Sequence, residues 1–258
     1  MNAPRSTILR TRGIVLRIAP FSRTSQVVTW LTSDRGKLVT IVKGAQRPKS
    51  AFLGQYDAYY TCDVLFYSRD REGAHILREC SPAKMRTGLR GAWRAAVCAS
   101  YLCDLCGHLV PAGQPNPEVY DLLNKGLDRL ASGRAEPARL CWFELHVLRA
   151  AGLSPQVDRC GDCGRTLAGG DEGMRFSAGR GVMLCGACST RPGDTAIPVA
   201  PPVLDGIQRF LRGDIPESAG TGPATVWLDQ VVVLLGRFLD FHVQMDTRSR
   251  AIALQLLS

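Results

Sequence analysis

The sequence predicts an α+β multidomain protein: an N-terminal five-stranded OB-fold β-barrel, then an all-α domain with a four-cysteine zinc-finger-like insertion. Three observations support this fold class. Apolar and polar residues alternate through residues 7–80, the apolar period changes from 2 to 3.6 near Arg90, and two C-x-x-C pairs stand between helical segments. At 258 residues, the chain is long enough for roughly two compact domains.

Five short strands account for the alternating segment. Ser33-Asp34-Arg35-Gly36 has the composition of a hairpin turn, and Gly13 is expected to form a bulge or bend in the first strand. The expected strands are Thr7–Ile18, Ser25–Thr32, Lys37–Lys43, Tyr56–Tyr67 and, after a turn at Arg69–Gly73, His75–Cys80. Short strands joined by basic loops favour a small closed barrel of the OB type.

Helical periodicity predominates from Arg90. The first helix ends before Pro111, and its apolar face is expected to be core, with a peptide-binding groove as the alternative. That face carries Trp93, Val97, Tyr101, Leu105 and Leu109. Further helices are expected at Pro117–Leu130, at Pro137–Ala151 with Gly152 as C-cap, at Pro202–Arg212 and, after the connection Gly213–Pro223, from about Thr225.

These limits divide the chain into four segments. Residues 1–82 are the barrel, 83–157 the first part of the helical domain, 158–192 the cysteine insertion and 193–258 the C-terminal part of the helical domain.

Positive charge is concentrated in the N-terminal third. Residues 1–94 contain 17 Lys and Arg against 6 Asp and Glu, whereas residues 95–258 contain 15 against 17. A one-sided field of this kind attracts nucleic acid or an anionic membrane surface, and strands rather than a basic amphipathic helix favour nucleic acid. The residues expected to line a DNA-binding groove are Arg10, Arg12, Arg17, Arg23, Arg35, Lys37, Lys43, Arg47 and Lys49.

Within this set, Arg47 and Lys49 are the strongest candidates because Gly44 and Pro48 should hold them on a projecting loop. Aromatic residues nearby offer faces for unpaired bases, but for each single one a place in the barrel core is the favoured interpretation. These residues are Phe21, Trp30, Tyr56, Tyr59 and Tyr60.

Two C-x-x-C pairs predict a metal site. Cys160 and Cys163 are separated from Cys185 and Cys188 by a spacer of 21 residues, marginally longer than is usual in a zinc ribbon. Four thiolates close a tetrahedron without leaving a position for water, so the expected cofactor is one structural Zn²⁺. Glycines at positions 161, 164 and 186 should permit the required turns.

The other cysteines and the histidines are expected to pack. Cys103 and Cys106 also form a C-x-x-C pair, but inside a helical pattern where buried thiols are expected. His146 and His242 fall on apolar helix faces.

Sequence motifs of catalysis are missing, which predicts a binding protein rather than an enzyme. Gly36-Lys37 is followed by Leu38, so there is no Walker loop, and neither G-x-S-x-G nor a deaminase H-x-E occurs. No apolar run approaches the roughly 18 residues of a membrane span, and residues 1–12 lack a signal-peptide core. The expected location is the cytoplasm, with no membrane partner.

Several motifs together resemble the RecO family of bacterial recombination mediators over nearly the whole chain. They are Gly13-Ile14-Val15-Leu16, Leu31-Thr32 to Gly36-Lys37, Lys43-Gly44-Ala45 with Arg47 to Ser50, the four cysteines, and a C-terminal helix ending near Arg248-Ser249-Arg250. The resemblance implies an OB-fold, a helical domain and a bound zinc.

The resemblance also implies an activity in DNA repair and recombination. It implies binding of single- and double-stranded DNA, annealing of complementary strands and, with RecR, loading of RecA onto DNA coated by single-stranded-DNA-binding protein. Further implied partners are the C-terminal tail of that coating protein and RecF, and the implied location is the nucleoid. Two alternatives stay open: a zinc-containing RNA-binding or RNA-modifying protein, and an assembly subunit that binds ribosomal RNA.

Overall fold

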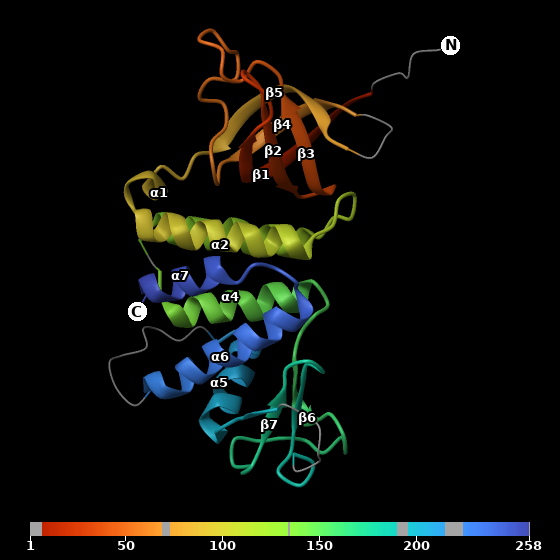
Figure 1. Cartoon of the computed structure of the whole chain (residues 1–258), viewed down its shortest axis with the longest axis vertical. Coiled ribbons are helices and arrows are strands. Elements are labelled where there is room, and N and C mark those ends of the chain that lie inside the picture. Colours follow the sequence, from red (N-terminus) through yellow and green to blue (C-terminus); the bar gives the residue numbers. More distant parts are fainter. Residues whose placement is uncertain (1–6, 69–72, 134, 190–195, 215–223, 258) are drawn as a thin grey trace. The chain divides into compact units, whose positions relative to one another are not determined.

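The computed structural model describes residues 7–68, 73–133, 135–189, 196–214 and 224–257. The chain divides into two compact units, residues 1–134 and 135–258, which are described separately. The first contains a five-stranded sheet and helices α1 to α3, and the second a small sheet and helices α4 to α7 (Figure 1). The mixed α+β class is therefore confirmed. Most of the turn at Arg69–Gly73 and of the connection Gly213–Pro223 lies outside the described residues.

Five strands close into a barrel in the order β1-β2-β3-β5-β4 (Figure 1). Neighbouring strands run antiparallel except β3 and β5, which pair in parallel through Thr40↔His75 and Ile41↔Ile76. The long strand β1 pairs with β4 along its first half and with β2 along its second half, so it can close the sheet on itself. The strands are β1 (Ile8–Pro20), β2 (Gln26–Thr32), β3 (Gly36–Val42), β4 (Thr61–Tyr67) and β5 (His75–Lys84).

Strands β1 and β5 extend to Pro20 and Lys84, beyond their expected ends at Ile18 and Cys80. Two further details of the barrel differ from expectation. The irregularity in β1 lies between Val15 and Arg17, not at Gly13. Gly13 instead allows close packing, because a Cβ there would lie 3.2 Å from Trp30 Cβ. Strand β4 begins at Thr61 rather than Tyr56, because Tyr60 N–H bonds to Asp57 O in a turn and Tyr59 has a φ of +67°.

The barrel interior follows the alternation of the strands. Trp30 is fully buried among Val15, Val28 and Phe66, and its indole Nε1 donates to Thr40 Oγ1 at 2.9 Å. That bond satisfies the polar atom of the largest core side chain.

Three helices complete the first unit. They are α1 (Gly88–Gly91), α2 (Trp93–Leu109) and α3 (Pro117–Ala131). The predicted apolar face of α2 is core at Tyr101 and Leu105, but Trp93 is 62% exposed. Cys103 and Cys106 are buried, as predicted, and burial raises the pKa of both thiols.

The second unit combines helices with a four-stranded sheet in the order β6-β8-β7-β9. The helices match expectation closely, since proline opens α4 and α5 and Gly152 follows α4 with a φ of +77°. The elements are α4 (Pro137–Ala150), β6 (Gln156–Cys160), β7 (Arg175–Ser177), β8 (Val182–Leu184), β9 (Ile197–Pro198), α5 (Pro201–Arg212), α6 (Ala224–His242) and α7 (Arg248–Leu257). No helix in the described ranges is both long and apolar enough to span a membrane.

The C-terminal helix differs from the prediction that a helix ends near Arg248. Helix α6 ends at His242, Gln244 has a φ of +51°, and α7 then begins at Arg248. Helix α7 brings Arg250 to Glu144 of α4, with Nε–Oε1 at 2.7 Å and Nη2–Oε2 at 3.0 Å. The Glu144 side chain is 0% exposed and that of Arg250 7%, so this ion pair is part of the unit's interior.

The two helical histidines pack as expected. His146 is buried and stacks on Trp142, with ring centroids 3.8 Å apart. His242 lies against Phe238, and its Nε2 is 2.8 Å from Ala178 O.

Candidate nucleic-acid interface and metal centre

Two loops meet at one end of the barrel: the β1–β2 turn (residues 21–25) and the basic loop (residues 43–50). Gln46 N–H donates to Thr24 O at 3.0 Å, and Gly44 N–H donates to Ser25 Oγ at 3.3 Å. The pairing Gln26↔Val42 at the ends of β2 and β3 places both loops at the same end. Segments about 20 residues apart in sequence therefore form one surface, which we call the loop cluster.

The basic loop is built from two successive turns. Arg47 N–H donates to Gly44 O at 3.1 Å, and Ser50 N–H donates to Arg47 O at 3.0 Å. Gly44 has a φ of +68°, a conformation that favours glycine. A Cβ at Gly44 would also lie 3.2 Å from Arg47 Cδ, so the glycine leaves room for the arginine side chain.

Four of the nine predicted DNA-binding residues lie in the loop cluster and are exposed: Arg23, Lys43, Arg47 and Lys49. None of them forms a salt bridge with another residue in the part of the chain that the structure describes. The sequence of residues 1–56 contains ten Lys and Arg and a single carboxylate, Asp34. Asp34 lies in the β2–β3 hairpin, at the opposite end of two seven-residue strands, which is a separation of roughly 20 Å. The loop cluster is therefore a positive surface with no acid of its own.

The other five predicted residues lie elsewhere on the first unit. Arg12 forms a two-bond pair with Asp63 at 3.0 and 3.2 Å, and Arg35 lies 3.5 Å from Asp34. Lys37 Nζ donates to Gly107 O at 2.8 Å. Arg17 is close enough to Asp104 to help lower the pKa of that carboxyl, although burial, the larger effect, raises it overall. Arg12, Arg35 and Lys37 are thus engaged with the protein itself, whereas Arg17 is exposed and has no salt bridge in the part of the chain that the structure describes.

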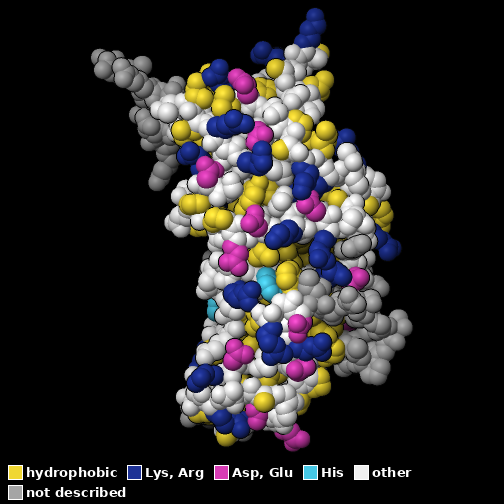
Figure 2. Space-filling view, turned by 180° about the vertical axis from the view of Figure 1, so that it is seen from behind, with side chains coloured by type: hydrophobic (Ala, Val, Ile, Leu, Met, Phe, Trp, Pro, Cys, Tyr) yellow, Lys and Arg dark blue, Asp and Glu magenta, His cyan; other side chains and the backbone are white. Residues whose placement is uncertain are grey.

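Arg10 lies in a different surface depression. It lines a groove of about 510 Å³ with Phe52 of the β3–β4 connection, Leu65 of β4 and Arg78 of β5. The nine residues thus do not line a single groove. In the space-filling view, Lys and Arg side chains are spread over the visible face with acidic side chains among them (Figure 2).

The aromatic candidates separate by burial. Trp30 is 0% and Tyr60 3% exposed, so neither can present a face to a base, and both have the core role that was the favoured interpretation of each aromatic residue. Tyr56 is half-buried against Trp30 and donates to Gln26 Oε1; burial raises the pKa of its phenol to about 12. Tyr59 is also half-buried and donates to Ala96 O at 3.1 Å. Phe21, in the β1–β2 turn, is 59% exposed.

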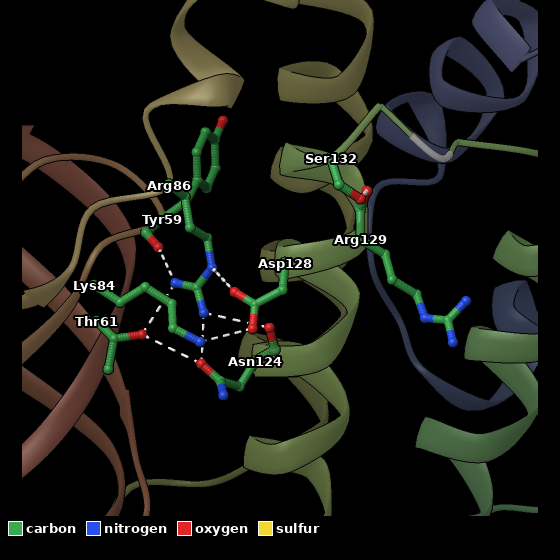
Figure 3. A network of polar contacts seen from close by, with 8 residues as sticks. All are labelled: Tyr59, Thr61, Lys84, Arg86, Asn124, Asp128, Arg129 and Ser132. Carbon is green, nitrogen blue, oxygen red and sulfur yellow. Dashed lines mark hydrogen bonds and ion pairs between the residues drawn. The ribbon is translucent and has the colours of Figure 1, made fainter.

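A buried arginine that the sequence did not single out joins the barrel to α3 (Figure 3). Arg86 lies two residues after the end of β5, and its side chain is 2% exposed. Its guanidinium donates to Asp128 Oδ1 at 2.8 Å, to Thr61 Oγ1 at 3.0 Å and to backbone oxygens of Tyr59 and Asn124. Lys84 reaches the other oxygen of Asp128 at 2.7 Å (Figure 3). The network fixes the barrel against α3.

The four predicted cysteines converge in the second unit. The Sγ atoms of Cys160, Cys163, Cys185 and Cys188 all lie within 4.8 Å of one another. Parallel pairing of β6 with β8 brings Cys160 beside Met183, and Cys185 follows β8 directly. Each C-x-x-C pair forms a turn, closed by Gly164 N–H to Cys160 O at 2.9 Å and by Cys188 N–H to Cys185 O at 3.0 Å.

Glycine has two roles around these turns. Gly164 has a φ of +72°, as a tight turn requires. Gly161 and Gly186 do not have a positive φ; they leave space, because a Cβ would lie 2.5 Å from Val182 Cγ2 and 2.7 Å from Glu172 O, respectively.

The sulfur geometry fits a tetrahedral metal ion. A metal with four sulfur ligands at about 2.3 Å requires sulfur–sulfur separations of about 3.8 Å. Cys163 Sγ and Cys185 Sγ are 3.8 Å apart, and all four cysteines are free thiols. Burial raises the pKa of the Cys160 thiol, but backbone N–H groups of Cys163, Cys185 and Asp162 outweigh it and lower this pKa to about 6. Cys160 thus favours the thiolate, the form that binds metal.

Comparison with known proteins covers both units. Residues 6–86 match the family Recombination protein O N terminal, and residues 90–251 match Recombination protein O C terminal. A DNA repair protein RecO from Anaeromyxobacter sp. strain K is 33% identical over 238 residues, which cover 91% of each chain. Another, from Moorella thermoacetica, is 30% identical over 187 residues, covering 72% of this chain and 68% of the relative. This chain therefore belongs to the RecO family.

Proposed function

We propose that the protein is a DNA repair and homologous recombination mediator that binds single- and double-stranded DNA through the loop cluster. The observation that carries this proposal is the set of four exposed cations on two hydrogen-bonded loops that contain no carboxylate. Such a surface attracts the phosphate backbone independently of base sequence. Membership of a family whose named relatives are DNA repair proteins supports the same role.

The proposal includes annealing of complementary strands. Cations that neutralise the phosphates of two strands lower the repulsion between them, and contacts that read no bases let the strands slide into register. With RecR, the protein would help to load RecA onto DNA coated by single-stranded-DNA-binding protein, whose C-terminal tail it contacts, with RecF as a further partner. A protein in this role works in the cytoplasm, at the nucleoid, and carries out no catalysis itself.

The domain assignment belongs to the proposal too. The strand order β1-β2-β3-β5-β4 with a parallel β3–β5 pair supports an OB-fold for residues 1–82. Residues 83–157 and 193–258 would be the helical segments on either side of the zinc-binding insertion, residues 158–192, although residues 83–134 belong to the same compact unit as the barrel. Cys160, Cys163, Cys185 and Cys188 would hold one Zn²⁺, which supplies folding energy to the short strands around it.

Binding preference tests this function. The full chain is titrated at one salt concentration with a single-stranded DNA oligonucleotide, the matching DNA duplex and a folded RNA of equal length. We expect tight binding to both DNA forms. A marked preference for the folded RNA would contradict the proposal and favour the alternative of a zinc-containing RNA-binding protein.

A further inference from the structure

Phe21 is the one exposed aromatic side chain within residues 7–68. It follows the last residue of β1 and is 59% exposed, whereas the other large aromatic residues of this range are buried or half-buried. Phenylalanine is a residue that proteins usually bury. Its ring is therefore accessible to any ligand that the charged loop cluster binds.

The backbone around Phe21 is held in a defined conformation. Phe21 N–H and Ser22 N–H both donate to Ser25 O, at 2.9 and 3.2 Å, which closes the β1–β2 turn. The bond from Gln46 N–H to Thr24 O then fastens this turn to the basic loop. The ring is thus carried by a structured turn, and a partner need not order the loop in order to use it.

The surroundings of Phe21 specify the chemistry of that partner. Arg23 is in the same turn, and the loop to which this turn is bonded carries Lys43, Arg47 and Lys49, with no carboxylate in either. Cations suit phosphates, and a phenyl face suits a planar, unpaired base. Single-stranded nucleic acid offers both groups at adjacent positions, whereas a duplex hides its base faces within the stack.

We infer that Phe21 is a stacking platform for an unpaired base, which strengthens the binding of single strands to the loop cluster without strengthening the binding of duplex. This inference rests on the proposed function, because the cations must first hold the phosphates of the same strand. Stacking on one aromatic side chain corresponds to a gain of about 5- to 140-fold in affinity per base.

The test compares variants of the full chain by fluorescence anisotropy with a dT oligonucleotide and with a DNA duplex. We expect Phe21→Ala to weaken dT binding by about fivefold or more and to leave duplex binding within twofold. Phe21→Trp should retain dT affinity, and the fluorescence that it adds should be quenched when dT binds. Leu53→Ala is the matched control, since Leu53 is 72% exposed and apolar but has no aromatic face.

Several results would overturn the inference. The inference fails if Phe21→Ala leaves dT binding unchanged, or if it weakens duplex binding as much as dT binding. It also fails if Phe21→Leu binds dT as well as the wild type does, because Phe21 would then make only an apolar contact. If Arg47→Glu/Lys49→Glu weakens DNA binding while Phe21→Ala does not, the proposed function stands and the stacking role fails. If the wild type binds vesicles of phosphatidylglycerol but neither DNA probe, both fail, and the loop cluster binds a membrane surface.

Discussion

Reversing two charges of the basic loop should weaken DNA binding by an amount that can be estimated. Arg47 and Lys49 are exposed and have no salt-bridge partner among the described residues, so their substitution breaks no internal ion pair. Each phosphate contact with a single strand contributes about 0.7 to the slope of log affinity against log salt. Between 1 M and 0.15 M salt, that slope corresponds to an affinity that is about fourfold higher per contact, or about 14-fold higher for two contacts.

The Arg47→Glu/Lys49→Glu variant should therefore bind single strands at least about 14-fold more weakly, with a salt slope smaller by about 1.4. Introduced carboxylates repel phosphate, so the estimate is a lower bound. Binding is measured by anisotropy across a salt series with oligonucleotides of different sequence, and all should lose affinity alike. Arg47→Glu alone is measured as well, and its matched control is Arg237→Glu, at an exposed arginine of α6 in the other unit. An unchanged slope, or a loss confined to certain sequences, would refute the reasoning.

Three other predictions concern the supporting structure. The purified, reduced wild type should contain one zinc per chain, and a zinc content of zero in it would exclude the site. Cys163→Ser should lower the metal content and increase proteolysis near residues 158–189. Arg250→Met should lower the free energy of unfolding in urea by about 3–5 kcal/mol, because Glu144 stays buried and charged. Glu144→Met/Arg250→Met should lower it far less, and equal losses for the two variants would contradict an ion-pair origin. Arg86→Met should lower the free energy of unfolding by about 2–4 kcal/mol and raise hydrogen exchange in α3. Lys84→Met, at a half-exposed site, should lower it by only about 0–1 kcal/mol.

Local pattern was enough to predict most elements of the fold. The alternation in β2 and β3, the prolines that open α3 and α4, and the spacing of the two C-x-x-C pairs each depend on residues close in sequence. The period-2 pattern also contained the signal that Trp30 is buried, because Val28, Trp30 and Thr32 share one face of β2. Applied strictly, it would have removed Trp30 from the stacking candidates.

Contacts between distant residues could not be predicted in this way. Arg250 and Glu144 are 106 positions apart, and Arg86 and Asp128 are 42 apart, so no periodicity relates them. The same limit applies to the predicted DNA-binding residues. Charge alone ranked Lys37 with Lys43, yet tertiary structure ties Lys37 Nζ to Gly107 O and leaves Lys43 exposed. Which cations are free for a ligand depends on which carbonyls and carboxylates the fold brings to them.

Strand annealing tests the central proposal most directly. Complementary oligonucleotides, bare or coated with single-stranded-DNA-binding protein, are mixed with the purified full chain across a salt series and without any nucleotide. We expect the wild type to anneal coated strands at a rate that falls as salt rises, and Arg47→Glu/Lys49→Glu to anneal them much more slowly. Failure of the wild type to anneal either form, despite tight binding to folded RNA, would contradict the mediator role.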